Sequence, residues 1–225
     1  NVSHNGFELD KYFKTDDLKK CSRFWIILFK TILSKLYHWK IYVVGSVEYQ
    51  YPNHLFQAGY FLDKKYYDEN TIDFKHLLLS EKNQSLLKDI QNSNSVGVHI
   101  RRGDYMTKQN LVIFGNICTQ KYYHDAIRII TEKVNDAVFY VFSDDISWVQ
   151  THLDIPNAVY VNWNTGESSI YDMYLMSSCK YNIIANSTFS YWAARLNKKT
   201  NMVIYPSKWY NTFTPDIFPE SWCGI

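Results

Sequence analysis

Two adjacent arginines, Arg101 and Arg102, follow a short apolar run, and Asp104 comes two residues later. A guanidinium group is planar and permanently charged, so such a pair suits bidentate contact with a phosphate or a pyrophosphate. Asp104 can hold one of the two arginines in place. An isolated Arg-Arg-x-Asp sequence is more often a surface ion-pair cluster, so the position of the motif in the fold must separate the two interpretations.

Two further groups have related chemistry. Asn186-Ser187-Thr188 stands directly before a predicted helix, where hydroxyl and N–H groups cap the helix or bind a phosphate at its positive end. Ser143-Asp144-Asp145 resembles the carboxylate pair that holds a divalent metal in some sugar-nucleotide enzymes. These carboxylates equally suit hydrogen bonds from a guanine edge or from ribose hydroxyls, or capping of a helix that begins at Ile146. The residues alone leave these alternatives open.

Composition narrows the class of protein. The chain has 225 residues, of which 46% are hydrophobic and 20% charged, so we expect a compact globular protein. Its 24 basic and 22 acidic residues nearly balance, which argues against a nucleic-acid partner and requires any anion site to be local. The phosphate-loop, GxGxxG, GxSxG and HExxH motifs are absent from the sequence. Kinase, dehydrogenase, hydrolase and zinc-protease interpretations therefore lose support.

Four widely spaced cysteines, without a CxxC motif or metal-ligand spacing, favour a reduced cytoplasmic environment. The most apolar stretch, Phe24 to Trp39, contains Lys30 and Lys35 and is too short to span a bilayer. It predicts an amphipathic helix that docks on its own domain. The alternative is peripheral contact with an anionic membrane surface, such as the inner face of a bacterial membrane.

From residue 95 onward, short apolar runs alternate with helical patterns, which predicts buried parallel strands joined by helices. The expected strands are Val96 to Ile100, Ala137 to Phe142, Ala158 to Val161, Tyr181 to Ala185 and Met202 to Tyr205. The expected helices are Gln120 to Glu132, Ile146 to His152, Ser168 to Ser178 and Thr188 to Leu196. Residues 95–225 thus read as an α/β domain with a doubly wound, Rossmann-type parallel sheet, and residues 1–94 as an incomplete, largely helical domain.

Ligands of such sheets bind beyond the carboxyl ends of the strands. The polar, chemically capable residues of this chain follow those ends. His99 to Asp104 closes the first predicted strand, Ser143-Asp144-Asp145 follows the second, Asn162 to Glu167 the third and Asn186-Ser187-Thr188 the fourth. This position favours an anion site over a surface ion-pair cluster.

Taken together, these motifs resemble the α-1,2-fucosyltransferases of bacterial and animal glycan synthesis, which form glycosyltransferase family 11. The matching blocks, in order, are His99–Tyr105, Phe139–Asp145, Asp172–Lys180 and Asn182–Trp192. His4–Leu9 and Tyr60–Leu62 agree as well, so the resemblance covers almost the whole chain.

The resemblance implies a GT-B-like pair of Rossmann-type domains, with residues 95–225 as the GDP-fucose-binding domain and residues 1–94 on the acceptor side. It implies transfer of L-fucose from GDP-fucose to the 2-hydroxyl of a terminal galactose in a glycan, with inversion. GDP-fucose is then the donor substrate, and neither a cofactor nor a metal is required. The resemblance therefore favours nucleotide contact over metal ligation for Asp144 and Asp145.

The family's site residues carry over onto matching positions. Arg101, with Arg102 beside it, would bind the donor pyrophosphate, and His99 would lie against the nucleotide. Asp144 or Asp145, next to Ser143, would fix guanine or ribose. Ser187, Thr188 and Phe189, preceded by Asn186, would border the phosphates. Asp104 is the nearest carboxylate for removing the acceptor proton, or it orients one of the arginines.

One departure concerns the start of the chain. Members of the family open with a glycine-rich segment of the Gly-Gly-Leu-Gly-Asn-Gln type, and this chain has none before His4. We therefore expect the acceptor-side domain to be incomplete here. The alternatives to a fucosyltransferase are a non-catalytic GDP-sugar or glycan-binding remnant, and a related transferase that uses another GDP-sugar.

Overall fold

The computed structural model describes residues 9–14, 32, 42–45, 56–59 and 72–225. Contacts between residues divide the chain into two compact units. The first comprises Asn1–Lys14, Ile72–Thr214 and Pro219–Ile225, and the second comprises Thr15–Thr71 and Pro215–Phe218. The division of the chain after residue 94 stays a prediction.

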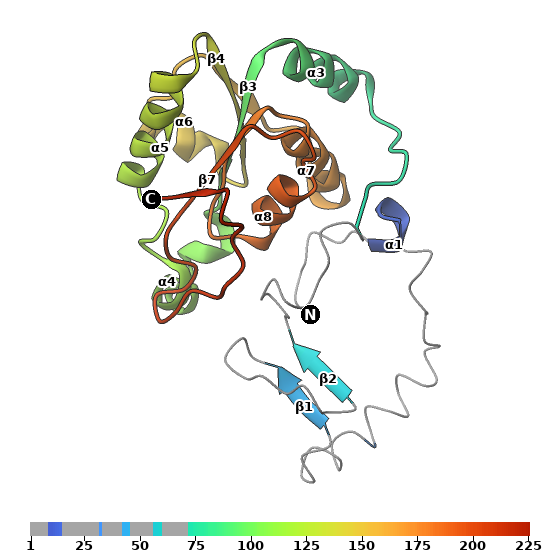
Figure 1. Ribbon diagram of the computed structural model, residues 1–225, viewed down its shortest axis with the longest axis vertical. Coiled ribbons are helices and arrows are strands. Elements are labelled where there is room, and N and C mark those ends of the chain that lie inside the picture. The colour runs from blue at the N-terminus through green and yellow to red at the C-terminus, as the bar shows by residue number, and fades with distance from the viewer. Residues whose placement is uncertain (1–8, 15–31, 33–41, 46–55, 60–71) are drawn as a thin grey trace. The chain divides into compact units, whose positions relative to one another are not determined.

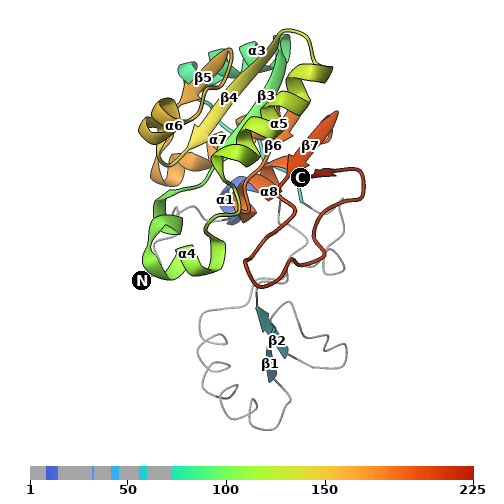
Figure 2. The ribbon, with the colours of Figure 1, turned by 90° about the vertical axis from the view of Figure 1, so that its left-hand side faces the viewer.

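The first unit contains a six-stranded sheet in which all neighbouring strands are parallel (Figure 2). The strands are β3 (Asn94–Ile100), β4 (Ala137–Ser143), β5 (Ala158–Val161), β6 (Tyr181–Ile183), β7 (Met202–Tyr205) and β8 (Cys223–Gly224). Their order across the sheet is β5-β4-β3-β6-β7-β8. The chain therefore builds outward from β3 to one edge, returns to β6 beside β3, and builds to the other edge. This is the doubly wound, Rossmann-type order that the sequence predicts.

Helices cover both faces of this sheet. On one face lie α5 (Gln120–Lys133) and α6 (Ile146–His152), and on the other α3 (Glu81–Asn92), α7 (Ser169–Ser177) and α8 (Thr188–Arg195) (Figures 1 and 2). Between β3 and α5 the chain forms a short 3-10 helix, η2 (Gly103–Met106), followed by α4 (Lys108–Phe114). The remaining short elements of the unit are α1 (Leu9–Tyr12) and η3 (Gly166–Ser168).

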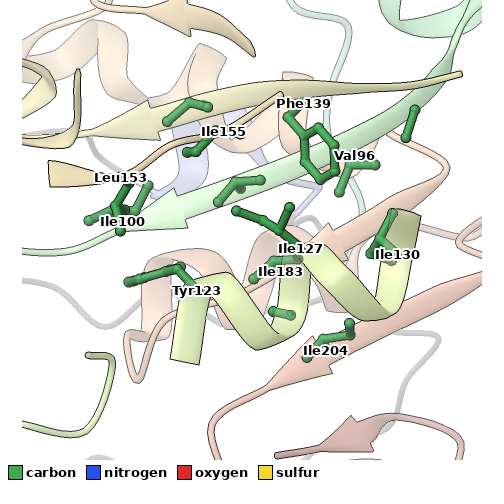
Figure 3. Close-up of a cluster of buried hydrophobic side chains, with 14 of the residues drawn as sticks. Val96, Ile100, Tyr123, Ile127, Ile130, Phe139, Leu153, Ile155, Ile183 and Ile204 are labelled. Carbon is green, nitrogen blue, oxygen red and sulfur yellow. The ribbon is translucent and has the colours of Figure 1, made fainter. Parts of the chain in front are cut away.

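The two helical layers bury two separate apolar cores, because side chains on a strand alternate between faces. On the α5 face, Val96, Val98 and Ile100 of β3 pack with Phe139 and Val141 of β4 (Figure 3). Tyr140 and Phe142, the alternate residues of β4, belong to the opposite core, which also contains residues of α3, α7 and α8. The apolar strands are thus buried on both sides, which is typical of a parallel sheet.

Helices α3, α5 and α6 begin at capped residues, as their sequences favour. The side chains of Ser80, Thr119 and Asp145 each accept a hydrogen bond from a backbone N–H in the first turn of α3, α5 and α6, respectively. Such caps satisfy N–H groups that have no partner within the helix. The start of each helix is therefore fixed locally, independently of packing.

The predicted strands and helices after residue 94 are all present, with ends that differ by no more than two residues. The sequence pattern did not predict α4 or β8. In the second unit, β1 (Tyr42–Gly45) and β2 (Phe56–Gly59) form a parallel pair, which the sequence pattern did not predict either.

The predicted helix from Phe24 to Trp39 lies, apart from Ile32, outside the described residues. Within the part of the chain that the structure describes, no helix is long and apolar enough to cross a membrane.

Truncating one buried side chain of the α5 core tests this packing. Ile130 of α5 is fully buried (Figure 3), so Ile130→Ala should lower the free energy of unfolding by about 2–5 kcal/mol through lost burial and the cavity left behind. Denaturant unfolding followed by circular dichroism measures this change. Val112→Ala, at a site where 73% of the residue is exposed, should stay within about 0.5 kcal/mol. Equal effects at the two positions would contradict the assigned core.

Candidate functional site

The sheet order reverses between β3 and β6, which are hydrogen-bonded neighbours. Chains that leave two such strands go to opposite faces of the sheet, so their carboxyl ends border a crevice where ligands of this fold class bind. The segment after β3 contains Arg101, Arg102 and Asp104, and the segment after β6 contains Asn186, Ser187 and Thr188. The two predicted motifs therefore meet at this point of the sheet.

The guanidinium group of Arg101 makes two short ion pairs. Its Nη2 lies 2.6 Å from Oδ1 of Asp104, and its Nη1 lies 2.9 Å from Oδ2 of Asp144. A guanidinium has five N–H donors, so these contacts leave donors available for a further anion. The side chain is 25% exposed. Arg101 is thus held in position from two sides while still open to solvent.

Asp144 fixes the backbone of the same loop. Its Oδ1 accepts a hydrogen bond of 2.9 Å from the backbone N–H of Arg102, while Oδ2 pairs with Arg101. A Cβ atom on Gly103 would lie 2.4 Å from Oδ2 of Asp144, which is far inside contact distance. The absence of a side chain at position 103 is therefore what lets this carboxylate approach the loop.

Arg102 points to a different carboxylate. Its Nε donates to Oδ2 of Asp145 at 3.1 Å, and its guanidinium carbon lies 3.6 Å from the ring centre of Trp148. Asp145 also caps α6, because its Oδ1 accepts from the N–H of Trp148. The bond from Arg102, together with that N–H, holds the pKa of Asp145 below its usual range. Ser143 completes the turn, since its Oγ accepts from the N–H of Asp145 at 3.0 Å.

His99 is buried on the face of the sheet that carries α8. His99 is 5% exposed, and the centre of its ring lies 5.2 Å from the ring centre of Phe189. Burial, with a smaller contribution from the charge of Arg101, lowers the pKa of His99 to about 3. The ring is therefore neutral near pH 7, and its Nδ1 atom has no hydrogen-bond partner among the described residues.

The N-terminus of α8 has no side-chain cap in the part of the chain that the structure describes. Ser187 precedes the helix without a side-chain cap, and its carbonyl accepts from the N–H of Tyr191. The N–H groups of Thr188 and Phe189 belong to the first turn, which lacks partners within a helix. Thr188 is exposed, whereas Ser187 is buried. This end of α8 can accept an anion, as the sequence predicts.

Asn186 differs from its neighbours, because its side chain is directed into the protein. It is 2% exposed, and its amide donates to the carbonyls of Trp209 and Phe114 at 3.0 and 3.3 Å. Its Oδ1 atom accepts from the thiol of Cys118. These bonds tie the turn before α8 to two other segments, so the contact between Asn186 and a ligand stays a prediction without support from this geometry.

The carboxylates of the region are used by arginines and by a helix N-terminus. Within the described ranges, no group of three or more His, Cys, Asp or Glu residues could hold a metal ion. The sequence left metal ligation, nucleotide contact and helix capping open for Asp144 and Asp145. The structure adds a further role, because both carboxylates hold the arginine loop.

Sequence reasoning assigned no role to Tyr105 or to Asp172. Tyr105 donates to the carbonyl of Asn186 at 2.9 Å, a contact that no local pattern reveals. Asp172, in the first turn of α7, accepts a hydrogen bond of 2.7 Å from Asn164, and burial raises the pKa of its carboxyl to about 7. A single acidic residue within an otherwise apolar helix was the available signal for Asp172.

Comparison with known proteins identifies the family of this chain. The model of glycosyl transferase family 11 matches residues 13–225 of the chain. The chain belongs to glycosyl transferase family 11. The predicted family is thereby confirmed for nearly the full length of the sequence.

Three curated proteins are similar in sequence to this family 11 chain. An alpha-1,2-colitosyltransferase of Escherichia coli is 35% identical over 196 residues, covering 80% of this chain and 63% of the relative. The O-antigen biosynthesis glycosyltransferase WbnK of Escherichia coli is 44% identical over 122 residues, covering 53% and 40%. Galactoside alpha-(1,2)-fucosyltransferase 2 of Pongo pygmaeus is 28% identical over 163 residues, covering 67% and 48%. The chain spans less than two thirds of each relative.

Among solved structures, the fucosyltransferase NodZ from Bradyrhizobium is similar to this family 11 chain. The match has 14% sequence identity and a TM-score of 0.41, and it covers 83% of this chain and 62% of NodZ. NodZ has also been determined after soaking with GDP-fucose, and that structure matches with a TM-score of 0.41. A similarity at this level supports no conclusion about the site.

The buried carboxyl of Asp172 should make stability depend on pH. Its pKa is raised to about 7 in the folded chain from 3.8 in the unfolded chain, so the folded state binds one more proton between these values. Stability should therefore fall as the pH rises from about 4 to about 7 and then level off. Asp172→Asn keeps the acceptor for Asn164 and should flatten this part of the melting-temperature profile. An unchanged slope in the variant would show that Asp172 ionises normally.

Proposed function

We propose that this family 11 chain contains the donor-binding domain of a glycosyltransferase that moves L-fucose from GDP-fucose to the 2-hydroxyl of a terminal galactose, with inversion. One observation carries the proposal. The partly exposed Arg101 follows β3 and the first turn of α8 follows β6, and β3 and β6 are the neighbouring strands between which the strand order reverses. A fixed cation and a helix N-terminus together suit a diphosphate.

The chemistry of transfer explains why donors are needed there. As the bond between fucose and phosphate breaks, the sugar gains oxocarbenium character and negative charge accumulates on the departing GDP. Positioned donors stabilise that charge more strongly in the transition state than in the bound donor. Arg101 and the N–H groups of Thr188 and Phe189 would supply this stabilisation, so we propose a reaction that requires no metal ion.

Asp104 has two candidate roles, and its geometry favours one. Its 2.6 Å ion pair with Arg101 orients that guanidinium and occupies Oδ1 of the carboxylate. We therefore assign Asp104 to orienting Arg101. The acceptor proton can leave late, to water or to a phosphate oxygen, when the sugar–phosphate bond is already largely broken.

Asp144 and Asp145 are reassigned on the same grounds. Their hydrogen bonds to Arg101, Arg102 and the helix α6 support a role in shaping the arginine loop. Contact with guanine or ribose stays a prediction for these carboxylates. Arg102 is engaged with Asp145 and Trp148, so we assign the diphosphate primarily to Arg101.

Identity to the colitosyltransferase favours a second candidate, transfer of another GDP-linked sugar such as colitose. Calorimetry with GDP, GDP-fucose and GDP-mannose, followed by transfer assays to a lactose-type acceptor with GDP-fucose and GDP-colitose, separates the possibilities. Transfer of fucose supports the proposal, and transfer of colitose alone supports the second candidate. Binding without transfer would indicate a remnant, and no binding of GDP would refute all three.

Replacing the central cation tests the diphosphate assignment directly. Arg101→Ala should weaken GDP binding by about 1.5–3 kcal/mol, the range for a hydrogen bond to a charged group. Isothermal titration calorimetry measures the change. Arg128→Ala is the matched control, because Arg128 makes only exposed ion pairs on α5 and its loss should leave GDP affinity unchanged. A folded Arg101→Ala variant with wild-type affinity would refute the assignment.

Metal independence is tested separately. GDP affinity and any transfer activity should be the same in excess EDTA and in millimolar Mg²⁺ or Mn²⁺, because the proposed donors are all side chains and backbone N–H groups. A loss of binding on chelation that added metal restores would instead support metal ligation by Asp144 and Asp145.

A further inference from the structure

Tyr105 connects the loop after β3 with the turn before α8. It lies in η2, directly after the arginines, and its hydroxyl donates a 2.9 Å hydrogen bond to the backbone carbonyl of Asn186, the residue before Ser187. We propose that Tyr105 is a positioning residue that sets the separation between the guanidinium of Arg101 and the N-terminus of α8. This inference rests on the proposed function, in which both groups bind the same diphosphate.

On the β3 side, the ring of Tyr105 lies beside Arg101. The guanidinium carbon is 5.7 Å from the ring centre, which places the cation near the negatively polarised face of the ring. Asp104 and Asp144 hold the same guanidinium from other directions. A shift of the Tyr105 ring would therefore directly change its contact with the guanidinium of Arg101.

On the β6 side, the accepting carbonyl is fixed. The Asn186 side chain is bonded to the carbonyls of Phe114 and Trp209 and to the thiol of Cys118. Because this residue cannot move without breaking several buried bonds, the Tyr105 hydroxyl is anchored to a rigid point. The bond therefore fixes the arginine loop relative to the start of α8, although the two bonded residues are 81 positions apart in the sequence.

Aromatic packing keeps the Tyr105 hydroxyl pointed at this carbonyl. The ring stacks on Phe114, with centroids 4.6 Å apart and an angle of 15° between the planes, and Phe114 in turn contacts Tyr210. Burial raises the pKa of the Tyr105 phenol well above its ordinary value. The group is therefore a neutral O–H donor throughout the physiological range, and the link does not depend on pH.

The consequence is geometric. A diphosphate has a fixed span, so simultaneous contact with Arg101 and with the N–H groups of α8 requires one separation between them. Losing the Tyr105 hydroxyl would leave both anion-binding groups intact but relax their spacing. The loss should appear in GDP affinity only while Arg101 is present, because without Arg101 there is no second contact to position.

A double-mutant cycle on GDP affinity tests this coupling. Tyr105→Phe removes only the hydroxyl and keeps the ring stack. It should weaken GDP binding roughly three- to tenfold, as expected for one neutral hydrogen bond. In an Arg101→Ala background the same change should have an effect of less than about twofold. Isothermal titration calorimetry of the four proteins of the cycle supplies all of the affinities.

Tyr122→Phe is the matched control. Tyr122 also donates a buried phenol hydroxyl to a backbone carbonyl after β6, that of Ile184 at 2.6 Å, but its ring belongs to the apolar core on the α5 face of the sheet. Its loss should lower the melting temperature about as much as Tyr105→Phe and leave GDP affinity unchanged. Phe114→Leu, which loosens the ring stack, gives a second variant with the same expected dependence on Arg101.

The outcomes separate the two hypotheses. Unchanged GDP affinity in Arg101→Ala would refute the proposed diphosphate site itself. A weakened Arg101→Ala with wild-type affinity in Tyr105→Phe would overturn the positioning role alone. Equal losses from Tyr105→Phe in both backgrounds, or a loss in Tyr122→Phe of the same size, would also overturn it, because they would indicate general destabilisation.

Discussion

The reversal of strand order between β3 and β6 is the constraint on which the rest of this structure depends. Parallel strands require crossover helices, and two crossovers that leave neighbouring strands for opposite faces leave their common edge uncovered. The chain places its charged loop on one side of that opening and the start of α8 on the other. Apolar burial on both faces makes the strands rigid, so loops of irregular conformation can be held at defined positions above them.

Two arginines and three carboxylates pair with one another in this part of the structure. Arg101 and Arg102 each have a carboxylate partner, and the carboxylates are themselves fixed by a backbone N–H or by the first turn of α6. A side chain held in this way loses little conformational freedom when an anion binds, because its order has already been established by folding. In the proposed site, an anion would therefore meet arginines that folding has already held in place.

The sequence predicted the sheet well because buried parallel strands and capped helices carry strong local signals. The apolar runs that become β3 to β7 are bounded by polar residues, and Asp145 caps α6. The two candidate anion-binding motifs stood out in the sequence because they follow strand ends. The inward direction of Asn186 could not be predicted, since an asparagine before a helix reads the same whether it faces solvent or the interior. The bond from Tyr105 joins residues distant in sequence, and only the folded sheet brings them together.

The ion pairs of Arg101 have a consequence for turnover. Asp104 and Asp144 lie within ion-pair distance of the guanidinium, so a diphosphate that binds there shares the cation with two carboxylates. In the proposed reaction the GDP left after transfer is bound by the same cation as the donor, and a bare arginine would hold it tightly. Because the two carboxylates already share the charge of Arg101, the proposed site would hold GDP less tightly than a bare arginine would, so the groups that orient Arg101 would also favour product release.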